Sequence, residues 1–202
     1  MNGSALKPCA SLKPDVNKLM KPVDVNTGLK LVIDKLESAS IDYMIVGSIA
    51  GAVYGEPRLT RAIDFVIAMS STLVRNLLAA FYPRDFYVPP AEILSQEITR
   101  CDQTNILHHE SGVKADLMFR KTTPHALEEF MRKRRLEILR GLSAWVAAPE
   151  DIIIGKLRFY REGESQKHLA DIRGIMANTE IDRAYLKRWV DQLGLQDYFQ
   201  KI

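Results

Sequence analysis

Residues 43–67, YMIVGSIAGAVYGEPRLTRAIDFVI, carry the pattern from which the fold of this chain is predicted. The first four residues are an apolar run typical of a buried strand, and the pair Gly47-Ser48 follows directly. The small residues of 49–54 suit a tightly packed short helix, and a loop containing a proline comes next. The apolar residues of 63–67 then predict a second strand. The stretch therefore predicts a strand, a glycine turn, a short helix, a loop and another strand.

Helical and strand patterns continue on both sides of this stretch. We expect helices over 26–38, about 71–81, 92–95, 125–133, 150–161, 168–178 and 182–193, and two hairpins, 105–119 around the two-residue turn Ser111-Gly112 and 135–146 around Arg140-Gly141. The order predicts an α+β domain over residues 25–148 and a helical C-terminal region, 149–202, packed on it. Residues 1–24 are rich in lysine and proline and are interpreted as a flexible N-terminal arm.

Composition limits the possible classes of protein. With 202 residues, 47% hydrophobic and 26% charged, the chain is long enough for one well-formed core and is not of a disordered or repetitive class. A net charge of +3 permits an anionic ligand but is too small to indicate nucleic-acid binding. No apolar run approaches the roughly 20 residues that cross a bilayer, so we expect no membrane partner. Two cysteines, Cys9 and Cys101, favour a reducing compartment, and hence a cytoplasmic location.

Two acidic residues fall on predicted strands. Asp64 follows Ile63 in the second strand of the opening stretch, and Asp116 lies in the middle of the apolar segment 113–119. A charge on a strand costs free energy unless it is ligated or paired. Asp116 is therefore a candidate for ligation, and an ion pair with Arg58 or Lys114 is the alternative.

The glycine-serine pair, the thirteen residues 49–61, the strand with Asp64 and the later Asp116 together resemble the nucleotidyltransferase superfamily. Its signature, on a DNA polymerase beta-like palm, is Gly-Gly or Gly-Ser, about ten residues, Asp-x-Asp and an aspartate on a later strand. Residues 54–64 are similar to the Tyr-Gly-x-Pro-Arg-x-Thr-x-Asp-Ile-Asp segment of bacterial abortive-infection toxin-type nucleotidyltransferases. The resemblance runs from about residue 29 to 193. It implies a palm-like mixed sheet with helices, followed by a helical end.

Ala62 stands where these proteins have their first metal-binding aspartate. Side chains alternate along a strand, so positions 62 and 64 share a face, and an Asp-x-Asp pair there can grip two magnesium ions. The resemblance makes Asp64 and Asp116 the catalytic and metal-binding residues. Two carboxylates can still hold one Mg²⁺ loosely, because this ion keeps water and substrate phosphate oxygens as its other ligands. We therefore expect the chain to be inactive or weakly active.

The remaining site residues are expected to bind the nucleotide. A glycine-serine bend at a helix N-terminus lets backbone N–H groups and the serine hydroxyl approach a triphosphate. Cations neutralise phosphate oxygens in such transfers, and the resemblance places a lysine of the C-terminal helices at the nucleotide tail. The predicted nucleotide-binding residues are Gly47, Ser48, Arg58, Thr60, Arg61 and Lys156. Asp116 is the candidate to accept the proton of the attacking hydroxyl.

Two hypotheses of function follow. The first is a protein that binds a nucleoside triphosphate such as ATP with Mg²⁺ and, if active, transfers a nucleotidyl group to a hydroxyl of RNA, protein or a small molecule, with pyrophosphate leaving. The second is a catalytically dead nucleotide-binding or partner-binding regulatory module of toxin–antitoxin type, with an antitoxin protein as partner.

Two other motifs have ordinary explanations beside functional ones. The basic run 132–135 is interpreted as a solvated helix end leading into an edge strand, with RNA contact as the alternative. His108 and His109 are adjacent on a predicted strand and point to opposite faces, so an exposed hairpin pair is favoured over a metal site.

Overall fold

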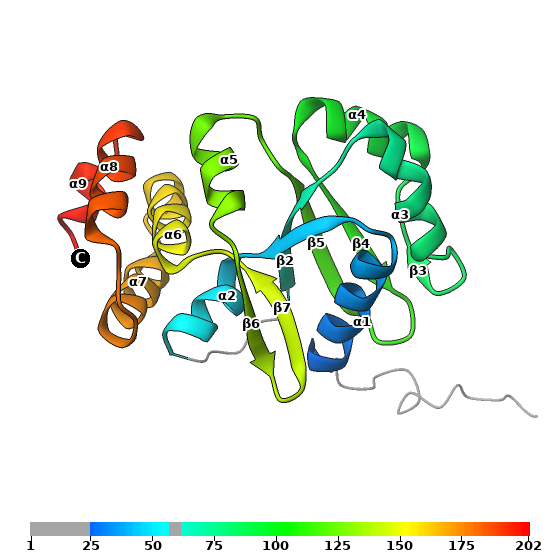
Figure 1. Cartoon of the computed structure of the whole chain (residues 1–202), viewed down its shortest axis with the longest axis horizontal. Helices are drawn as coiled ribbons and strands as arrows, with labels where there is room; N and C mark the ends of the chain where they lie inside the picture. The colour runs from blue at the N-terminus through cyan, green and yellow to red at the C-terminus, as the bar shows by residue number, and fades with distance from the viewer. Residues whose placement is uncertain (1–24, 57–61) are drawn as a thin grey trace, which may run out of the picture.

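The computed structural model describes residues 25–56 and 62–202 and is shown in Figure 1. The helices are α1 (Val25–Ser38), α2 (Gly47–Tyr54), α3 (Val74–Ala80) after a 3-10 turn (Ser71–Leu73), α4 (Ala91–Arg100), α5 (Pro124–Met131), α6 (Pro149–Gly163), α7 (Gln166–Asn178), α8 (Arg183–Gln192) and α9 (Gln196–Phe199). The strands are β1 (Asp42–Ile45), β2 (Ala62–Ala68), β3 (Phe86–Tyr87), β4 (Gln103–His108), β5 (Lys114–Phe119), β6 (Arg134–Leu139) and β7 (Leu142–Val146).

Within the described residues, these strands form one mixed sheet with the order β3-β4-β5-β2-β1-β7-β6. The β2 strand is central: it is antiparallel to β1 and parallel to β5. A parallel pair needs a crossover connection, which here contains α3 and α4. The mixed sheet with its helices confirms the predicted α+β fold.

One face of the central strands is fully buried and the other is only half-buried. In β2 and β5 the burial alternates with period two, as expected for strands that pack on a core with one face. The buried face carries Ile63, Phe65, Ile67, Ala115, Leu117 and Phe119, each at most 4% exposed. The Phe65 ring meets Tyr43 of β1 edge to face, with ring centroids 5.8 Å apart. The residues between them, including both aspartates, therefore face the less buried side.

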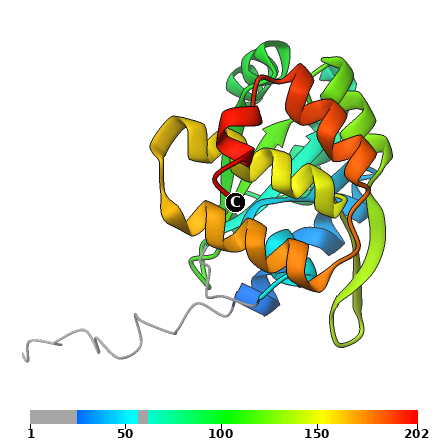
Figure 2. The same cartoon turned by 90° about the vertical axis from the view of Figure 1, so that its left-hand side faces the viewer.

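The C-terminal helices gather at one end of the molecule, beside α2 (Figures 1 and 2). Helix α6 contacts α2, α7, α8 and α9, while α1, α3 and α4 form a separate group. The start of α8 is fixed by Asp182, whose side chain accepts a hydrogen bond from the Tyr185 backbone N–H at 3.0 Å. The domain boundary between residues 148 and 149 stays a prediction. Among the described helices, none combines the length and apolar character of a membrane span.

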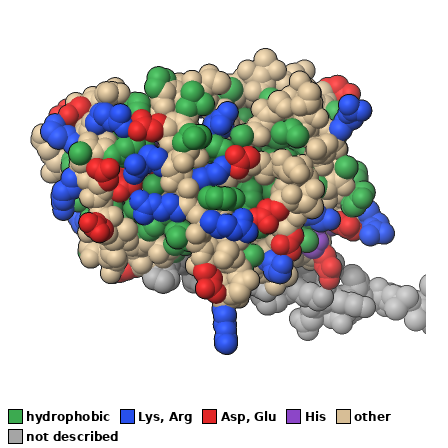
Figure 3. Space-filling model, viewed as in Figure 1, with side chains coloured by type: hydrophobic (Ala, Val, Ile, Leu, Met, Phe, Trp, Pro, Cys, Tyr) green, Lys and Arg blue, Asp and Glu red, His purple; other side chains and the backbone are tan. Residues whose placement is uncertain are grey.

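Acidic partners surround the basic run 132–135. Arg132 lies 2.7 Å from Glu150, Lys133 pairs with Asp42, and Arg135 lies 3.1 Å from Glu37. Basic and acidic side chains are likewise interspersed on the face shown in Figure 3. These pairs agree with the interpretation of the run as a helix end and edge strand rather than an RNA-binding patch.

In the part of the chain that it describes, the structure differs from the sequence prediction at four places, one of which is the short helix α9 that was not expected. The short helix expected over 92–95 is the ten-residue α4, and the two-stranded pairing of β3 with β4 was not expected. The first hairpin does not turn on two residues, because a five-residue loop, 109–113, joins β4 to β5. In that loop Ser111 Oγ lies 2.8 Å from His108 Nδ1, and the Gly112 N–H donates to the His108 carbonyl. The side chain and the backbone of His108 are therefore both hydrogen-bonded within the longer turn.

Candidate functional site

Asp64 and Asp116 lie directly beside one another across two parallel strands. They are register partners in the β2 and β5 pair, and both project from the half-buried face. Asn105 of β4 is the register partner of Asp116 on its other side. The two carboxylates predicted from the sequence are therefore brought together. Together with Asn105 they form a row of three polar residues across β2, β5 and β4.

Gly47 permits a close approach between the glycine-serine turn and Asp64. The residue has φ +66°, in the left-handed region that favours glycine, and a Cβ placed on it would lie 2.2 Å from Asp64 Oδ2. The Val46 N–H donates to the Asp64 carbonyl at 2.9 Å, which ties the end of β1 to β2. Glycine is therefore favoured here both by the left-handed backbone and by the aspartate that lies against it.

The Ser48 backbone N–H donates to the Asp64 carboxylate. This N–H belongs to the first turn of α2, where backbone donors have no partner within the helix. Asp64 thus caps α2 from a neighbouring strand, and its negative charge is favourable at the positive end of the helix. From the sequence we expect this N–H to approach a triphosphate. In the structure it donates to the Asp64 carboxylate instead.

Burial raises the pKa of the Asp64 carboxyl above its ordinary value of 3.8, and the neighbouring Asp116 adds to the rise. The Ser48 N–H, Lys114 and Lys156 act in the opposite direction. Asp116 itself forms an ion pair with Lys114, with Asp116 Oδ1 2.8 Å from Lys114 Nζ. The ion pair that the sequence left as an alternative for Asp116 is therefore present with Lys114. The site holds two like charges close together and balances them with two lysines.

Replacing Gly47 by alanine should lower the free energy of unfolding by about 2 kcal/mol, since the new methyl group strains a left-handed backbone and displaces the Asp64 carboxylate. Urea unfolding of the Gly47→Ala variant measures the loss. Gly141→Ala is the matched control, because Gly141 also has a positive φ, of 76°, but an added Cβ meets nothing within 4 Å. Equal losses in the two variants would show that the contact with Asp64 contributes nothing.

Lys156 approaches the site from the C-terminal helices. Its Nζ lies 2.6 Å from Asp171 Oδ2 of α7, and both side chains are at most 16% exposed. A Cβ added to Gly51 of α2 would lie 3.3 Å from the same nitrogen, so the lysine passes directly over α2. Beside it, a cleft of about 110 Å³ opens between α2 and α7, lined by Ser48, Gly51, Ala52, Glu56, Ala170, Asp171 and Gly174. Helix packing therefore brings the predicted nucleotide-binding lysine to within electrostatic reach of Asp64.

A magnesium ion fits this site only in part. The described residues contain no group of three or more His, Cys, Asp or Glu side chains that could hold a metal ion. Ala62 shares the half-buried face with Asp64 but offers no oxygen from its side chain. Two carboxylates can bind one Mg²⁺ when phosphate and water supply the other ligands, whereas the two-metal site that the sequence resemblance implies has a third carboxylate at position 62.

Three predicted site residues cannot be placed, and the two adjacent histidines, for which a metal site was not favoured, contact other residues. Arg58, Thr60 and Arg61 lie outside the described residues, so their nucleotide-binding roles stay predictions. His109 Nε2 lies 3.3 Å from the Pro83 carbonyl oxygen. His108 bonds within the β4–β5 loop instead. Sequence reasoning gave no site role to Asn105 or Asp171. The resemblance to the superfamily, which runs to about residue 193, covers Asp171 but assigned it no role.

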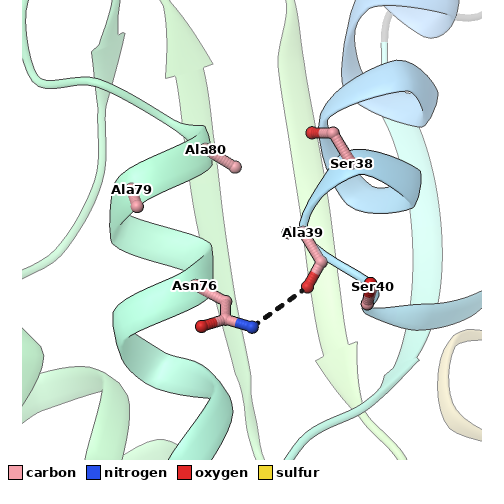
Figure 4. A pocket seen from close by; sticks show the side chains of 6 residues that line it. All are labelled: Ser38, Ala39, Ser40, Asn76, Ala79 and Ala80. Atoms are coloured by element: carbon pink, nitrogen blue, oxygen red, sulfur yellow. Dashed lines mark hydrogen bonds between the residues drawn. The ribbon is translucent and has the colours of Figure 1, made fainter.

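A larger pocket lies away from these residues. It has a volume of about 300 Å³ and is lined by Ser38, Ala39, Ser40, Asn76, Ala79 and Ala80, between the end of α1 and helix α3 (Figure 4). Asn76 Nδ2 donates to the Ala39 carbonyl at 3.3 Å across it. None of these lining residues carries a charge, so the pocket offers a triphosphate no cation.

Comparison with known proteins supports the architecture. No protein-family model matches the chain, and no curated protein matches it at a significant level. Among solved structures, an antigenic nucleotidyltransferase-like protein from Paracoccidioides brasiliensis is similar, with 24% identity and a TM-score of 0.52, over 76% of this chain and 74% of that one. ANT(2'')-Ia in complex with adenylyl-2''-tobramycin is also similar, with 11% identity and a TM-score of 0.58, over 88% of this chain and 99% of that one. The chain therefore has a nucleotidyltransferase fold, as the sequence resemblance predicted.

Proposed function

We propose that this chain binds a nucleoside triphosphate at the face formed by Asp64, Asp116 and the Gly47-Ser48 turn. The register pairing of the two aspartates beside the N-terminus of α2 is the observation that carries the proposal. Two lysines supply positive charge around the pair, and the cleft between α2 and α7 opens next to Ser48. A helix N-terminus with nearby cations favours a polyphosphate.

In this role the phosphate chain competes with Asp64 for the Ser48 N–H. Asp64 accepts this bond in the structure described here, and burial beside Asp116 disfavours its charged form. A triphosphate oxygen that takes over the N–H would release the carboxylate toward a cation. Lys156 lies over α2 and is placed to neutralise the nucleotide phosphates while it keeps its contact with Asp171.

Magnesium is part of the proposal as a single ion. Asp64 and Asp116 would hold it together with phosphate oxygens, and it would polarise the α-phosphate for attack by a hydroxyl. Asp116 is the residue proposed to accept the proton of that hydroxyl. Ala62 removes the third carboxylate, so we expect nucleotidyl transfer to be very slow.

The acceptor would be a hydroxyl of RNA, protein or a small molecule. ANT(2'')-Ia, which shares the fold, has been solved with adenylyl-2''-tobramycin, a nucleotidylated small molecule. This supports a small-molecule acceptor as the first class to test. The similarity to toxin-type nucleotidyltransferases keeps RNA and protein as further classes.

Thermal unfolding with ATP, GTP, CTP or UTP at millimolar concentration and Mg²⁺ tests the binding proposal. At about ten times the Kd, the preferred triphosphate should stabilise the fold by roughly 1.4 kcal/mol and raise Tm by about 3–5 °C. Lys156→Gln should lose most of this shift. Lys187→Gln should keep it, because Lys187 pairs with Asp191 at the same 2.6 Å but lies on α8. No shift with any of the four would contradict the proposal.

Ala62 also favours a second candidate, a catalytically dead regulatory module that binds a nucleotide or a partner protein such as an antitoxin. An inactive nucleotide site can still change the conformation or stability of its protein through ligand binding. The two candidates differ in transfer activity after Ala62 is restored to aspartate, which the dead module would still lack. A module that binds only a partner protein would in addition show no triphosphate-dependent shift in Tm.

A further inference from the structure

Lys114 lies across from the position of the missing aspartate. Ala62 of β2 and Lys114 of β5 are register partners. They lie two residues before the Asp64 and Asp116 pair on the same two strands. Residues two apart on a strand share a face, so all four residues lie on the half-buried face. The half-buried face of β2 and β5 therefore carries the primary amine of Lys114 opposite position 62, where alanine replaces the aspartate of the resembled family.

The Lys114 ammonium is already part of the site. It lies 2.8 Å from Asp116 Oδ1 and lowers the pKa of Asp64 through its positive charge. Its side chain is 49% exposed, so a ligand can reach it. An ammonium has three N–H donors, and one bond to Asp116 leaves the others available for further oxygens.

We propose that Lys114 bridges Asp116 and the phosphate chain of a nucleoside triphosphate, so that this site binds the nucleotide without a divalent cation. The inference rests on the proposed function and deepens it: binding of the triphosphate needs no Mg²⁺, and the single ion proposed above serves the transfer step alone. A lysine is a point charge that binds phosphate well, and here it takes the place between carboxylate and phosphate that a metal ion otherwise takes.

Charge around the site supports this assignment. A cluster of three carboxylates repels a triphosphate strongly unless metal ions neutralise it. In this chain alanine at position 62 removes one negative charge from the row, and Lys114 adds a positive one next to Asp116. An aspartate at position 62 would also compete with phosphate for the same ammonium. The absence of a carboxylate at position 62 and the presence of Lys114 therefore both favour binding of a triphosphate without a metal ion.

Isothermal titration calorimetry with ATP, GTP, CTP and UTP, in millimolar EDTA and again in millimolar MgCl₂, tests the inference. For the preferred triphosphate we expect the wild-type Kd to differ less than about threefold between the two conditions. Lys114→Met should raise the Kd in EDTA at least about tenfold, and Lys114→Arg should stay within about threefold of wild type. Lys30→Met is the matched control, because Lys30 forms a similar exposed pair, with Asp34 at 2.7 Å, on α1.

Binding of Mn²⁺ without nucleotide, followed by electron paramagnetic resonance, gives a second readout. In this measurement Lys114→Met should increase the affinity, whereas it should decrease the affinity for the nucleotide. Lys114→Met releases Asp116 from its ion pair, so the variant should bind Mn²⁺ at least about threefold more tightly than wild type. Damage to the fold would weaken binding of both metal and nucleotide. A variant that loses nucleotide in EDTA and gains affinity for Mn²⁺ therefore identifies the bridging role.

The contrary results separate the inference from the proposed function. Binding of a triphosphate by wild type only in MgCl₂ overturns the inference and leaves the proposed function in place. Binding in EDTA that Lys114→Met does not change overturns it in the same way. Absence of binding in both conditions overturns the inference and the proposed function together.

Discussion

Replacing Ala62 by aspartate should raise nucleotidyl transfer at least about a hundredfold over the wild-type chain. Position 62 lies on the same face as Asp64, and the intervening Ile63 is buried on the other face. The new carboxylate would complete the row that two-metal chemistry needs, and one group that stabilises transition-state charge is typically worth 10²- to 10³-fold. Because Lys114 would pair with the new carboxylate, Ala62→Asp combined with Lys114→Met should be more active still.

The measurement is label transfer from each α-phosphate-labelled triphosphate onto aminoglycoside-like small molecules, bulk RNA and bulk protein. Ala62→Asp combined with Asp116→Asn is the control and should fall back to the wild-type level. Suppose instead that the restored variant binds a triphosphate but labels no acceptor with any of the four nucleotides. The chain would then be a binding module, as the second candidate function states.

Replacing Glu129 by glutamine should stabilise the fold by about 3 kcal/mol at pH 8.5 and have little effect at pH 5. Burial raises the pKa of Glu129 from 4.5 to about 8, and the nearby Asp151 adds to the rise while Arg158 opposes it. Glu129 Oε2 lies 3.8 Å from His125 Nδ1, and both ring nitrogens of His125 are buried without a hydrogen bond to any described residue. The carboxylate has no strong partner there to offset its loss of solvation.

The direction of the pH dependence follows from the two pKa values. Folded Glu129 keeps its proton up to about pH 8, whereas the unfolded chain releases it near pH 4.5. The stabilising contribution is therefore complete below about pH 4.5 and is lost as the pH rises to about 8. Urea unfolding at pH 5, 7 and 8.5 should show this loss in wild type and a flatter profile in Glu129→Gln.

Glu128→Gln is the control for that experiment, because Glu128 is the neighbouring acid on α5, its side chain is 37% exposed, and it pairs with Arg188 at 2.5 Å. It should leave the pH profile of the wild type unchanged. A wild-type stability that rises between pH 5 and 8 would contradict the assignment of Glu129 as a buried, protonated acid.

The central row of the sheet could be predicted from the sequence because its signal is periodic and local. Apolar residues alternate with Asp64 and with Asp116, and alternation along a strand places both acids on the less buried face. The likeness to solved nucleotidyltransferase folds confirms the architecture. The catalytic and metal-binding roles of these residues stay predictions.

The partners of the site residues could not be predicted, because they depend on how distant elements approach one another. Nothing near Ser48 in the sequence indicates that its N–H meets a carboxylate sixteen residues later. The pairing of Lys156 with Asp171 depends on the packing of α6 against α7. Local patterns fix which face a side chain occupies, whereas tertiary packing fixes which charge it meets.

The triphosphate site can be located by nitrogen-15 NMR of the amide groups during titration with the preferred nucleoside triphosphate. We expect the largest shifts at Gly47, Ser48 and the strand residues Asp64 and Asp116, with smaller changes near Lys156 on α6. Shifts gathered around Asn76 and the pocket between α1 and α3, with none at the glycine-serine turn, would contradict this placement of the site.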